Sequence, residues 1–425
     1  MLRHARALIL PSLLGFEFRG ASRLRAGRGG AVPSAWGATR RGGPRRLMRT
    51  CRRASRLAGV ALSLALLAAC GGSPTETTPQ VLVTDAMFLG ADISALERIE
   101  QAGGVFRNAG QAGDAIAILR AQGVNGFRLR LFVDPNHSEV QVNDLDYTVR
   151  MAARIQASGA RFLLDFHYSD TWADPSHQTV PASWAALGLD SLERRVETYS
   201  ADVMTRLRAA GALPDIVQVG NEIDAGFLWP LGQLSYGSDS LASWERFTRL
   251  LKAGIRGVRG ALGPADSVQV LLHYSQGADG GGTQWFFDHV VRYGVPFDLI
   301  GLSYYPWWHG MPAYLRLNLT ATATRYGRGV MVVETTYPWR AGGWESWATN
   351  PAWMAWPVSP QGQAQYLREV LDMVAEVPGG RGAGVVWWYP EAIQVPGLFV
   401  WGGGSLSLFD AGGNVLPAAG EFGVR

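Results

Sequence analysis

The sequence predicts an α/β protein built on one (β/α)8 barrel, a TIM barrel with enlarged loops after its strands. Short apolar runs rich in β-branched and aromatic residues recur eight times from about residue 85 onward, and helical patterns lie between them. Near-continuous apolar strands that alternate with helices indicate parallel strands covered on both faces. The chain has 425 residues, of which 47% are hydrophobic and 17% charged, so it can bury a core of this size.

The eight apolar runs are the predicted barrel strands. In chain order they are Met87–Ile93, Gly126–Val133, Arg161–Tyr168, Ile216–Glu222, Val268–Tyr274, Leu299–Tyr305, Val330–Thr335 and Gly384–Tyr389. A doubly wound open sheet is the competing architecture, and it would bind a nucleotide through a glycine-rich turn after its first strand. The first run here ends in GADIS, with neither GxGxxG nor a P-loop after it, so the barrel is favoured.

Two of the predicted helices have clear boundaries. One covers Leu192–Ala210 with apolar residues on one face, Asp190 and Glu193 at capping spacing at its start, and Gly211 after its end. The other covers roughly Gln363–Ala375, between a Ser-Pro pair and a Pro-Gly-Gly turn.

The positive charge of the chain is concentrated in its first 69 residues. They hold 14 Arg and one acidic residue, Glu17, whereas the whole chain has a net charge of +4 and a pI near 9.2. The rest of the chain is therefore acidic, and nucleic acid is not an expected partner. Residues 1–47 lack periodicity, and we interpret them as an extension from a mis-called start codon, with Met48 as the initiator. A functional basic arm is the alternative.

Residues 48–69 are predicted to be a lipoprotein signal peptide. An Arg-rich start precedes the uncharged run Leu57–Ala69, whose 13 residues are too few to span a bilayer. The run ends in LAAC, which resembles the bacterial lipobox, in which the cysteine, here Cys70, becomes the lipidated first residue. An ordinary signal peptide with a chance cysteine is the alternative. Residues 70–84 would then be a lipid-anchored linker and 85–425 the barrel domain of an exported protein, held at the cell surface or in the periplasm.

Polar and aromatic residues lie at the carboxyl ends of the predicted strands, and many of them are residue types that are uncommon in an apolar core. Each alone can be structural, since an Arg can pair with a carboxylate inside a barrel and a His can be a satisfied core residue. Eight strand ends of this kind are hard to explain by packing, and in a barrel these ends converge on the catalytic mouth. The residues are Asp92, Arg128, Arg130, Asp165, His167, Asn221, Glu222, His273, Tyr304, Tyr305, Glu334, Trp387 and Trp388.

Two carboxylates among them suit glycoside hydrolysis. Glu222 follows Asn221 at the end of the fourth predicted strand, and Glu334 ends the seventh, so their side chains can face each other across the mouth. In a retaining glycosidase one carboxyl protonates the leaving oxygen and the other attacks the anomeric carbon. The acid must keep its proton near neutral pH, so its pKa must be raised by burial or by the other carboxylate.

Sugar binding needs flat apolar faces beside hydrogen-bonding groups, and the segment after the third predicted strand provides both. It reads DFHYSDTWADPSHQTVPASW from Asp165 to Trp184, and it contains the candidate substrate-binding residues His167, Asp170 and Trp172. Further aromatic residues in predicted loops, in the stretches FLW and WWH, extend the same rim.

The chain resembles glycoside hydrolase family 53, the arabinogalactan endo-β-1,4-galactanases, from about Met87 to Ala418. The matching stretches are FLGADIS, GVNGFRLRLFVDP, DFHYSDTWADPSHQTVPASW, IVQVGNEI, GLSYYPWW, VVETTYP and LFDAGGNVLPA. The resemblance implies a (β/α)8 barrel that cleaves β-1,4-galactan, the side chains of pectic type I arabinogalactan, internally and with retention of configuration.

The resemblance also implies roles for individual residues. Glu222 resembles the acid/base and Glu334 the nucleophile, while Asn221 would bond the sugar 2-hydroxyl and either Tyr304 or Tyr305 would steady Glu334. Arg128 would lie beside the nucleophile, and Trp388 would be a platform for a sugar ring. The full set of expected substrate-binding residues is Asp92, Arg128, His167, Asp170, Trp172, Asn221, Tyr304, Tyr305 and Trp388.

No cofactor or metal is expected. Some bacterial relatives carry a calcium loop of DxDxHxN type after the seventh strand, but residues 339–357 here contain one carboxylate, Glu345, and calcium prefers six to eight oxygen ligands. Two alternatives stay open: another barrel endo-glycosidase, such as a mannanase or cellulase, and a surface lipoprotein that binds glycan without cleaving it. We expect a monomer whose partners are the galactan substrate and, through Cys70, a membrane.

Overall fold

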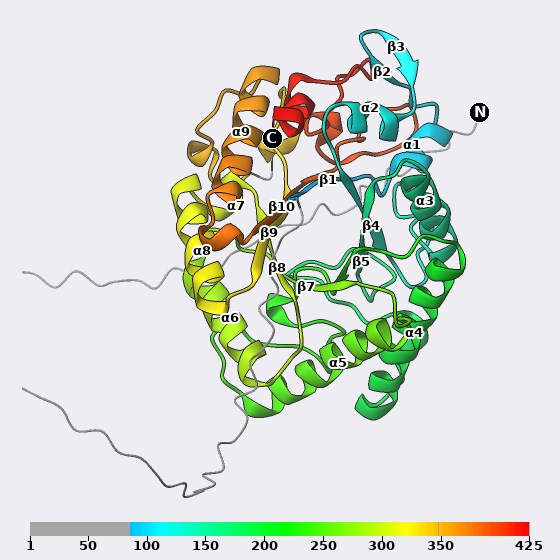
Figure 1. Ribbon diagram of the computed structural model, residues 1–425, viewed down its shortest axis with the longest axis vertical. Helices are drawn as coiled ribbons and strands as arrows, with labels where there is room; N and C mark the ends of the chain where they lie inside the picture. The colour runs from blue at the N-terminus through cyan, green and yellow to red at the C-terminus, as the bar shows by residue number, and fades with distance from the viewer. Residues whose placement is uncertain (1–85, 347, 425) are drawn as a thin grey trace, which may run out of the picture. The chain divides into compact units, whose positions relative to one another are not determined.

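A closed barrel of eight parallel strands forms the centre of the protein (Figure 1). The computed structural model describes residues 86–346 and 348–424. Each strand pairs with its neighbours in chain order, and the last pairs with the first. The strands are β1 Phe88–Asp92, β4 Gly126–Leu131, β5 Arg161–Phe166, β6 Ile216–Val219, β7 Gln269–Tyr274, β8 Leu299–Tyr304, β9 Gly329–Thr335 and β10 Gly382–Trp388. Each overlaps one predicted run, so the predicted (β/α)8 barrel is confirmed.

Helices surround the barrel in the segments between its strands (Figure 1). They are α1 Leu96–Gln101, α2 Ala115–Ala121, α3 Leu145–Ala157, α4 Leu189–Ala209, α5 Leu241–Gly260, α6 Gly280–Arg292, α7 Pro306–His309, α8 Pro312–Tyr326 and α9 Pro360–Ala375. A short hairpin of β2 (Phe106–Asn108) and β3 (Gln111–Gly113) between α1 and α2 was not predicted. The 3-10 segment Pro417–Val424 is joined to α9 by a 2.7 Å ion pair between Arg368 and Glu421.

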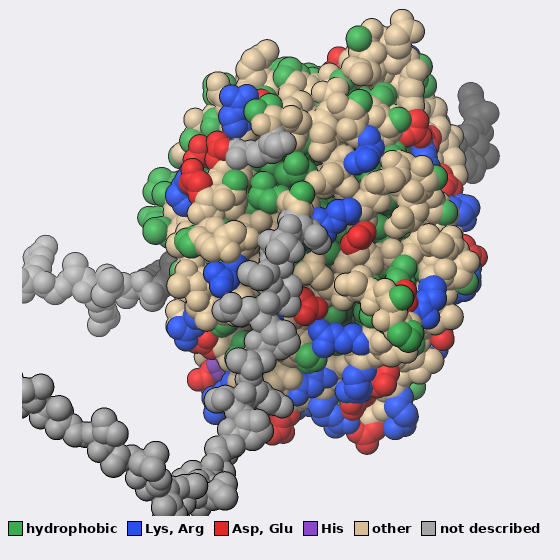
Figure 2. All heavy atoms as spheres, in the orientation of Figure 1, with side chains coloured by type: hydrophobic (Ala, Val, Ile, Leu, Met, Phe, Trp, Pro, Cys, Tyr) green, Lys and Arg blue, Asp and Glu red, His purple; other side chains and the backbone are tan. Residues whose placement is uncertain are grey.

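The predicted cap of α4 is wrong. The helix begins at Leu189 after Gly188, and no side chain caps its first turn. Asp190 and Glu193 instead pair across the helix interface with Arg249 of α5, at 2.7 and 2.9 Å. Figure 2 shows basic and acidic side chains mixed along the edge of the molecule where Figure 1 places α4 and α5. The partners of these carboxylates lie on another helix, so the local spacing that suggested a helix cap did not predict their role.

The core has two apolar layers because both faces of each strand are covered. One layer lies between the strands and the surrounding helices, and the other fills the inside of the barrel. Gly126 makes room for the inner layer, since a Cβ atom there would lie 2.4 Å from the ring of Phe88. The inner layer consists of Phe88, Leu163, Ile216, Leu271, Leu299, Met331, Val333, Ala383 and Val386.

The inward-facing positions nearer the carboxyl ends of the strands are polar. Side chains alternate between the two faces of a strand, so Asp165 follows Leu163 on the inside of β5 and His273 follows Leu271 on the inside of β7. The apolar interior therefore supports a polar layer at the end of the barrel where catalytic groups gather in this architecture.

The predictions for the signal peptide, for Cys70 and for the linker fall on residues 1–84, outside the described residues. Within the described part of the chain, no helix is both long and apolar enough to cross a membrane.

Candidate active site

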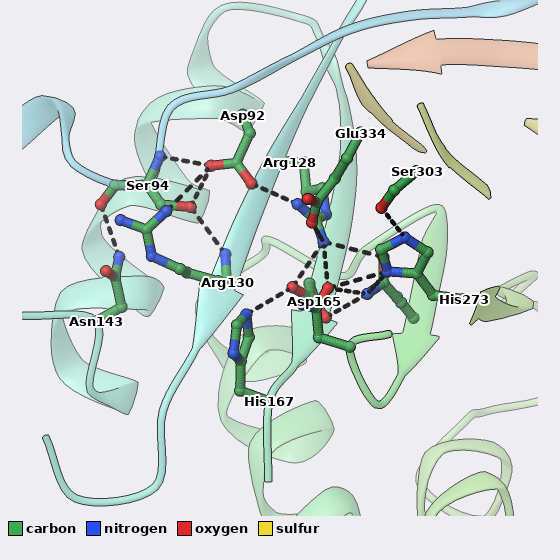
Figure 3. Close-up of polar contacts among 12 residues, drawn as sticks. Asp92, Ser94, Arg128, Arg130, Asn143, Asp165, His167, His273, Ser303 and Glu334 are labelled. Carbon is green, nitrogen blue, oxygen red and sulfur yellow. Dashed lines mark hydrogen bonds and ion pairs between the residues drawn. The ribbon is translucent and has the colours of Figure 1, made fainter. Parts of the chain in front are cut away.

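Arg128 is the centre of the buried polar layer (Figure 3). Its guanidinium lies 2.8 Å from carboxylate oxygens of Asp92 on β1, Asp165 on β5 and Glu334 on β9. Burial alone would lower the pKa of Arg128, but the charges of Asp165, Glu334 and Asp92 raise it above its ordinary value. One permanent cation therefore holds three carboxylates together.

Glu334 is aimed into the mouth of the barrel by a β-bulge near the end of β9. The pairing with β8 is regular up to Val332, and one extra residue, Val333, then precedes Glu334. A bulge re-aims the side chains that follow it, so Val333 fills the inner core while the next residue still reaches Arg128. The second oxygen, Oε2, accepts a 3.0 Å hydrogen bond from the hydroxyl of Tyr305. Both oxygens of Glu334 are thus held by donors.

Glu222 follows β6 in the left-handed backbone region, with φ +47°. Residues other than glycine seldom adopt this conformation, and such strain gathers at functional sites. Its Oε1 atom accepts a 2.6 Å hydrogen bond from the hydroxyl of Ser303 on β8. The side chain keeps part of its surface open to solvent, unlike Glu334, which is buried. A ligand in the mouth can therefore reach Glu222.

The two glutamates have different electrostatic surroundings. Desolvation and then the negative charge of Glu334 raise the pKa of Glu222 well above its ordinary value. Desolvation also raises the pKa of Glu334, but the cation of Arg128 opposes that rise. Arg128 thus favours a charge on Glu334 and leaves the proton on Glu222. Two carboxyls whose pKa values are separated in this way can act as nucleophile and acid.

Asn221 connects this pair to the polar layer. Its Oδ1 atom accepts hydrogen bonds from Arg128 at 3.0 Å and from Gln218 at 2.9 Å, and its Nδ2 group donates one of 2.8 Å to the carbonyl of Ala173. These bonds fix the amide beside Glu222 in one orientation. Nδ2 carries a second hydrogen that can bond a ligand.

A row of indole rings lines the mouth beside Glu334. We call it the aromatic wall, and it consists of Trp172, Trp388, Trp401 and Trp308. Successive ring centroids lie 6.4, 4.7 and 5.9 Å apart. Tyr305, which bonds Glu334, lies 5.4 Å from Trp308. The wall offers apolar faces for the C–H surfaces of sugar rings, next to the paired carboxylates.

A comparison with protein families decides what kind of site this is. Residues 88–422 match the model of glycosyl hydrolase family 53. The chain belongs to glycoside hydrolase family 53. It is therefore a glycoside hydrolase, as its sequence predicted.

Relatives and solved structures agree with membership in family 53. A probable arabinogalactan endo-β-1,4-galactanase A of Aspergillus terreus is 38% identical over 327 residues, which cover 75% of this chain and 89% of the relative. The GH53 catalytic domain of Ignisphaera aggregans superposes with a TM-score of 0.72 at 31% identity, covering 82% of this chain and 98% of that one. A fungal β-1,4-galactanase gives a TM-score of 0.70 at 30% identity, with 80% and 100% covered.

Of the two tyrosines expected to steady the family 53 nucleophile, Tyr305 is the one in contact with Glu334. The prediction of Tyr304 as a site residue is wrong. Its side chain is fully buried, and its hydroxyl donates to the carbonyl of Gly310 at 2.9 Å, while its ring stacks on Tyr366 outside the barrel. Successive residues of a strand face opposite sides, and the one that faces the mouth follows β8 rather than ending it.

Three other predicted substrate-binding residues make contacts within the protein. His167 is buried and uses both ring nitrogens, Nε2 at 3.0 Å from Asp165 and Nδ1 as acceptor from Ala173 N–H. Asp170 accepts backbone N–H groups of Asp134 and Ala182, one on each oxygen. Asp92 is fully buried beside Arg128. These contacts order the loops around the mouth, and a direct sugar contact by any of the three stays a prediction.

Trp172, predicted in the segment after the third strand, and Trp388, predicted at the end of the eighth, come together in the aromatic wall. Arg130 lies behind the wall, with its guanidinium carbon 4.3 Å from the ring centroid of Trp172. This distance suits a cation–π interaction, which helps to fix the ring.

Sequence reasoning missed three residues of the site: Ser303, Gln218 and Trp401. Ser303 and Gln218 are neutral polar residues within apolar strands. Ser303 lies two positions before Tyr305 and Gln218 two positions after Ile216, and this spacing is the sequence feature that indicates that they face the inside of the barrel. Trp401 lies in the long segment after β10, where no periodicity orients a side chain.

Among residues 86–346 and 348–424, no group of three or more His, Cys, Asp or Glu side chains could hold a metal ion. The carboxylate of Glu345, in the loop compared with a calcium site, accepts the backbone N–H groups of Gly342 and Gly343 at 3.3 and 2.8 Å.

Proposed function

We propose that this chain is a retaining endo-β-1,4-galactanase that hydrolyses the galactan side chains of type I arabinogalactan by double displacement. The observation that carries the mechanism is the unequal environment of Glu222 and Glu334, of which only the latter is paired with Arg128. The family and the galactanase name borne by the Aspergillus terreus relative support the substrate.

In the first step a carboxylate oxygen of Glu334 attacks the anomeric carbon while Glu222 gives its proton to the glycosidic oxygen. The bond between carbon and leaving oxygen breaks, and a glycosyl ester of Glu334 forms. Arg128 and Tyr305 hold the nucleophile in place before the attack. Asn221, beside the acid, offers its free amide hydrogen to the sugar 2-hydroxyl.

In the second step Glu222 acts as a base. Once Glu334 is esterified it carries no charge, so the repulsion that raised the pKa of Glu222 disappears and the carboxylate form becomes more favourable. Glu222 then takes a proton from water, and the water oxygen displaces Glu334 from the anomeric carbon. Two inversions give net retention of configuration.

The aromatic wall supports binding of a polymer in the mouth. Galactose rings have one apolar face, and the wall from Trp172 to Trp308 places several indoles in succession beside the reacting centre. Trp388 is the member that we assign as platform for the sugar next to Glu334.

The test is a substrate panel. Purified enzyme is incubated with linear β-1,4-galactan, mannan, xylan and cellulose, and release of reducing ends is measured. We expect release from galactan and loss of it in the Glu334→Gln variant, which keeps the shape of the side chain but cannot form the glycosyl ester. Equal rates on mannan, xylan or cellulose would contradict the substrate. Binding of galactan without any release would identify a glycan-binding protein instead.

We also propose that the mature protein is a monomer, is exported, and is anchored to a membrane by lipid on Cys70. The sequence LAAC after a short apolar run supports this anchor.

A further inference from the structure

Ser303 and His273 form a hydrogen-bonded chain that ends on Glu222 (Figure 3 shows the link between Ser303 and His273). The Nε2 atom of His273 lies 2.8 Å from Ser303 Oγ, which lies 2.6 Å from Glu222 Oε1. On the other side of the ring, Nδ1 lies 3.3 Å from the backbone nitrogen of Glu222 itself. His273 and Ser303 are buried. The imidazole therefore contacts the backbone of Glu222 directly and its carboxyl through one hydroxyl.

The direction of each proton in this chain follows from the donors present. The backbone N–H of Glu222 can only donate, so Nδ1 of His273 must carry a lone pair. Gln218 Nε2 also lies 3.0 Å from Nδ1, but its two hydrogens have nearer acceptors, Asp165 Oδ1 at 2.7 Å and Asn221 Oδ1 at 2.9 Å. Asn221 Oδ1 is also 3.0 Å from Nδ1, but it already accepts from Arg128 and Gln218. The hydrogen of the neutral ring is then on Nε2 and points at Ser303.

We propose that His273 and Ser303 are positioning residues for the acid/base Glu222. Because Nε2–H of His273 donates to the Ser303 oxygen, the Ser303 hydroxyl hydrogen cannot point at the ring, and it is donated to the other partner of this hydroxyl, Oε1 of Glu222. Oε1 is then an acceptor in both protonation states, and the proton that is exchanged with substrate and water is confined to Oε2. Among the described residues no hydrogen bond engages Oε2. The inference rests on the proposed role of Glu222.

The charges around this chain support a neutral ring. Burial and then the cation of Arg128 lower the pKa of His273 well below its ordinary value, and His167 and His309 act in the same direction against Asp165. The groups that act on the Glu222 carboxyl are Glu334, Asp224 and Asp174, which raise its pKa, and Ser303, which lowers it; Tyr305 also faces it. Ser303 is thus the donor that acts against desolvation and three negative charges, although the pKa of Glu222 stays raised.

The test compares two serine substitutions. Ser303→Ala removes the donor to Glu222, and the alkaline limb of kcat/KM on an unactivated galacto-oligosaccharide should move up by about one pH unit, because the carboxylate form loses a charge-assisted bond. Ser275→Ala is the matched control, since the Ser275 hydroxyl bonds the neighbouring carboxyl Asp224 at 2.8 Å. Its loss raises the pKa of Asp224, weakens the repulsion on Glu222, and leaves the limb in place or moves it down. A uniform loss of activity in Ser303→Ala without a shifted limb would overturn the proposal.

Nitrogen-15 NMR of the wild-type protein gives a second readout that needs no variant to fold. We expect His273 to be neutral with its hydrogen on Nε2 from pH 5 to pH 8, whereas a hydrogen on Nδ1 or a charged ring would overturn the chain as described. Failure of the galactan assignment can be distinguished from failure of this proposal, because the alkaline limb can be measured on whichever glycan the enzyme cleaves. If galactan is cleaved but the alkaline limb of Ser303→Ala does not move, the positioning role of His273 and Ser303 is wrong and the galactanase assignment stands.

Discussion

Replacing Arg128 with methionine tests the cation at the centre of the site. Methionine has a similar length and is apolar, so the substitution leaves Asp92, Asp165 and Glu334 buried without the charge that they share. Removing one partner from a buried ion pair costs about 3–5 kcal/mol. At about 2 cal/mol/K per residue over residues 88–422, the entropy of unfolding is ~0.7 kcal/mol/K, so a loss of ~4 kcal/mol lowers Tm by about 6 °C.

The size of this loss should depend on pH. In the wild type, desolvation would raise the pKa of Asp165, but Arg128 together with His167 and His273 lowers it below its ordinary value. A lowered pKa gives stability that is present at neutral pH and is lost as pH falls through the folded-state value. Without Arg128, the strongest of the effects that oppose desolvation is lost and His167 and His273 oppose it alone, so the folded-state pKa of Asp165 rises and the variant is destabilised as pH rises. The difference in Tm between wild type and Arg128→Met should therefore be largest near pH 7 and shrink toward pH 4.

The same substitution should change the pH dependence of catalysis. Arg128 is the cation that opposes the raised pKa of Glu334, and loss of an adjacent opposite charge typically raises a carboxyl pKa by about 1–3 units. Less of the nucleophile is then ionised at neutral pH, so the acid limb of kcat/KM moves up.

Thermal unfolding followed by circular dichroism between pH 4 and 8, together with pH profiles of kcat/KM, measures both effects. Arg154→Met is the control: Arg154 also pairs with Glu100, at 2.6 Å, but on the partly exposed outer face of α3, where an ion pair contributes about 1 kcal/mol or less. A loss of Tm in Arg128→Met that is the same at every pH, or an unmoved acid limb, would refute the account of Arg128.

Three further substitutions test other parts of the account. Tyr305→Phe removes the hydroxyl that donates to Glu334 and should lower kcat/KM about tenfold, whereas Tyr304→Phe, whose hydroxyl bonds Gly310, should leave kcat/KM within about twofold; the reverse order would contradict the assignment. Glu222→Ala should still form the glycosyl ester from an activated aryl galactobioside, and added azide should then give a β-galactosyl azide, identified by NMR. An α-azide would contradict the assignment of Glu222 as acid/base. Cys70→Ser should release the protein from the membrane fraction, and unchanged fractionation would exclude the lipid anchor.

The barrel could be predicted because its strands are buried on both faces. Such strands read as continuous apolar runs, and eight of them alternating with helices leave few architectures. The position of the site followed from the same pattern, since parallel strands bring their carboxyl ends to one mouth and Arg128, Glu222 and Glu334 all lie at such ends. The two glutamates are far apart in sequence, yet the topology alone brings them to one mouth.

The sequence could not settle which face each terminal residue takes. Apolar residues on both faces of β8 hide the period of two, so the sequence does not distinguish Tyr304 from Tyr305. The bulge that aims Glu334 leaves no local sequence pattern either. Long-range partners were also invisible. Asp190 and Glu193 fitted a helix cap by spacing, but Arg249 of the neighbouring helix holds them, and Ser303 acquires its importance only through Glu222, 81 positions away.

The stereochemistry of the first product tests the central claim most directly. Proton NMR of linear β-1,4-galactan, recorded in the first minutes after enzyme is added, shows the configuration of the new reducing end before mutarotation mixes the anomers. Double displacement through Glu334 with Glu222 as acid and base predicts that the β-anomer appears first and the α-anomer grows later. If the α-anomer appears first, the enzyme inverts configuration, and Glu334 cannot be a covalent nucleophile.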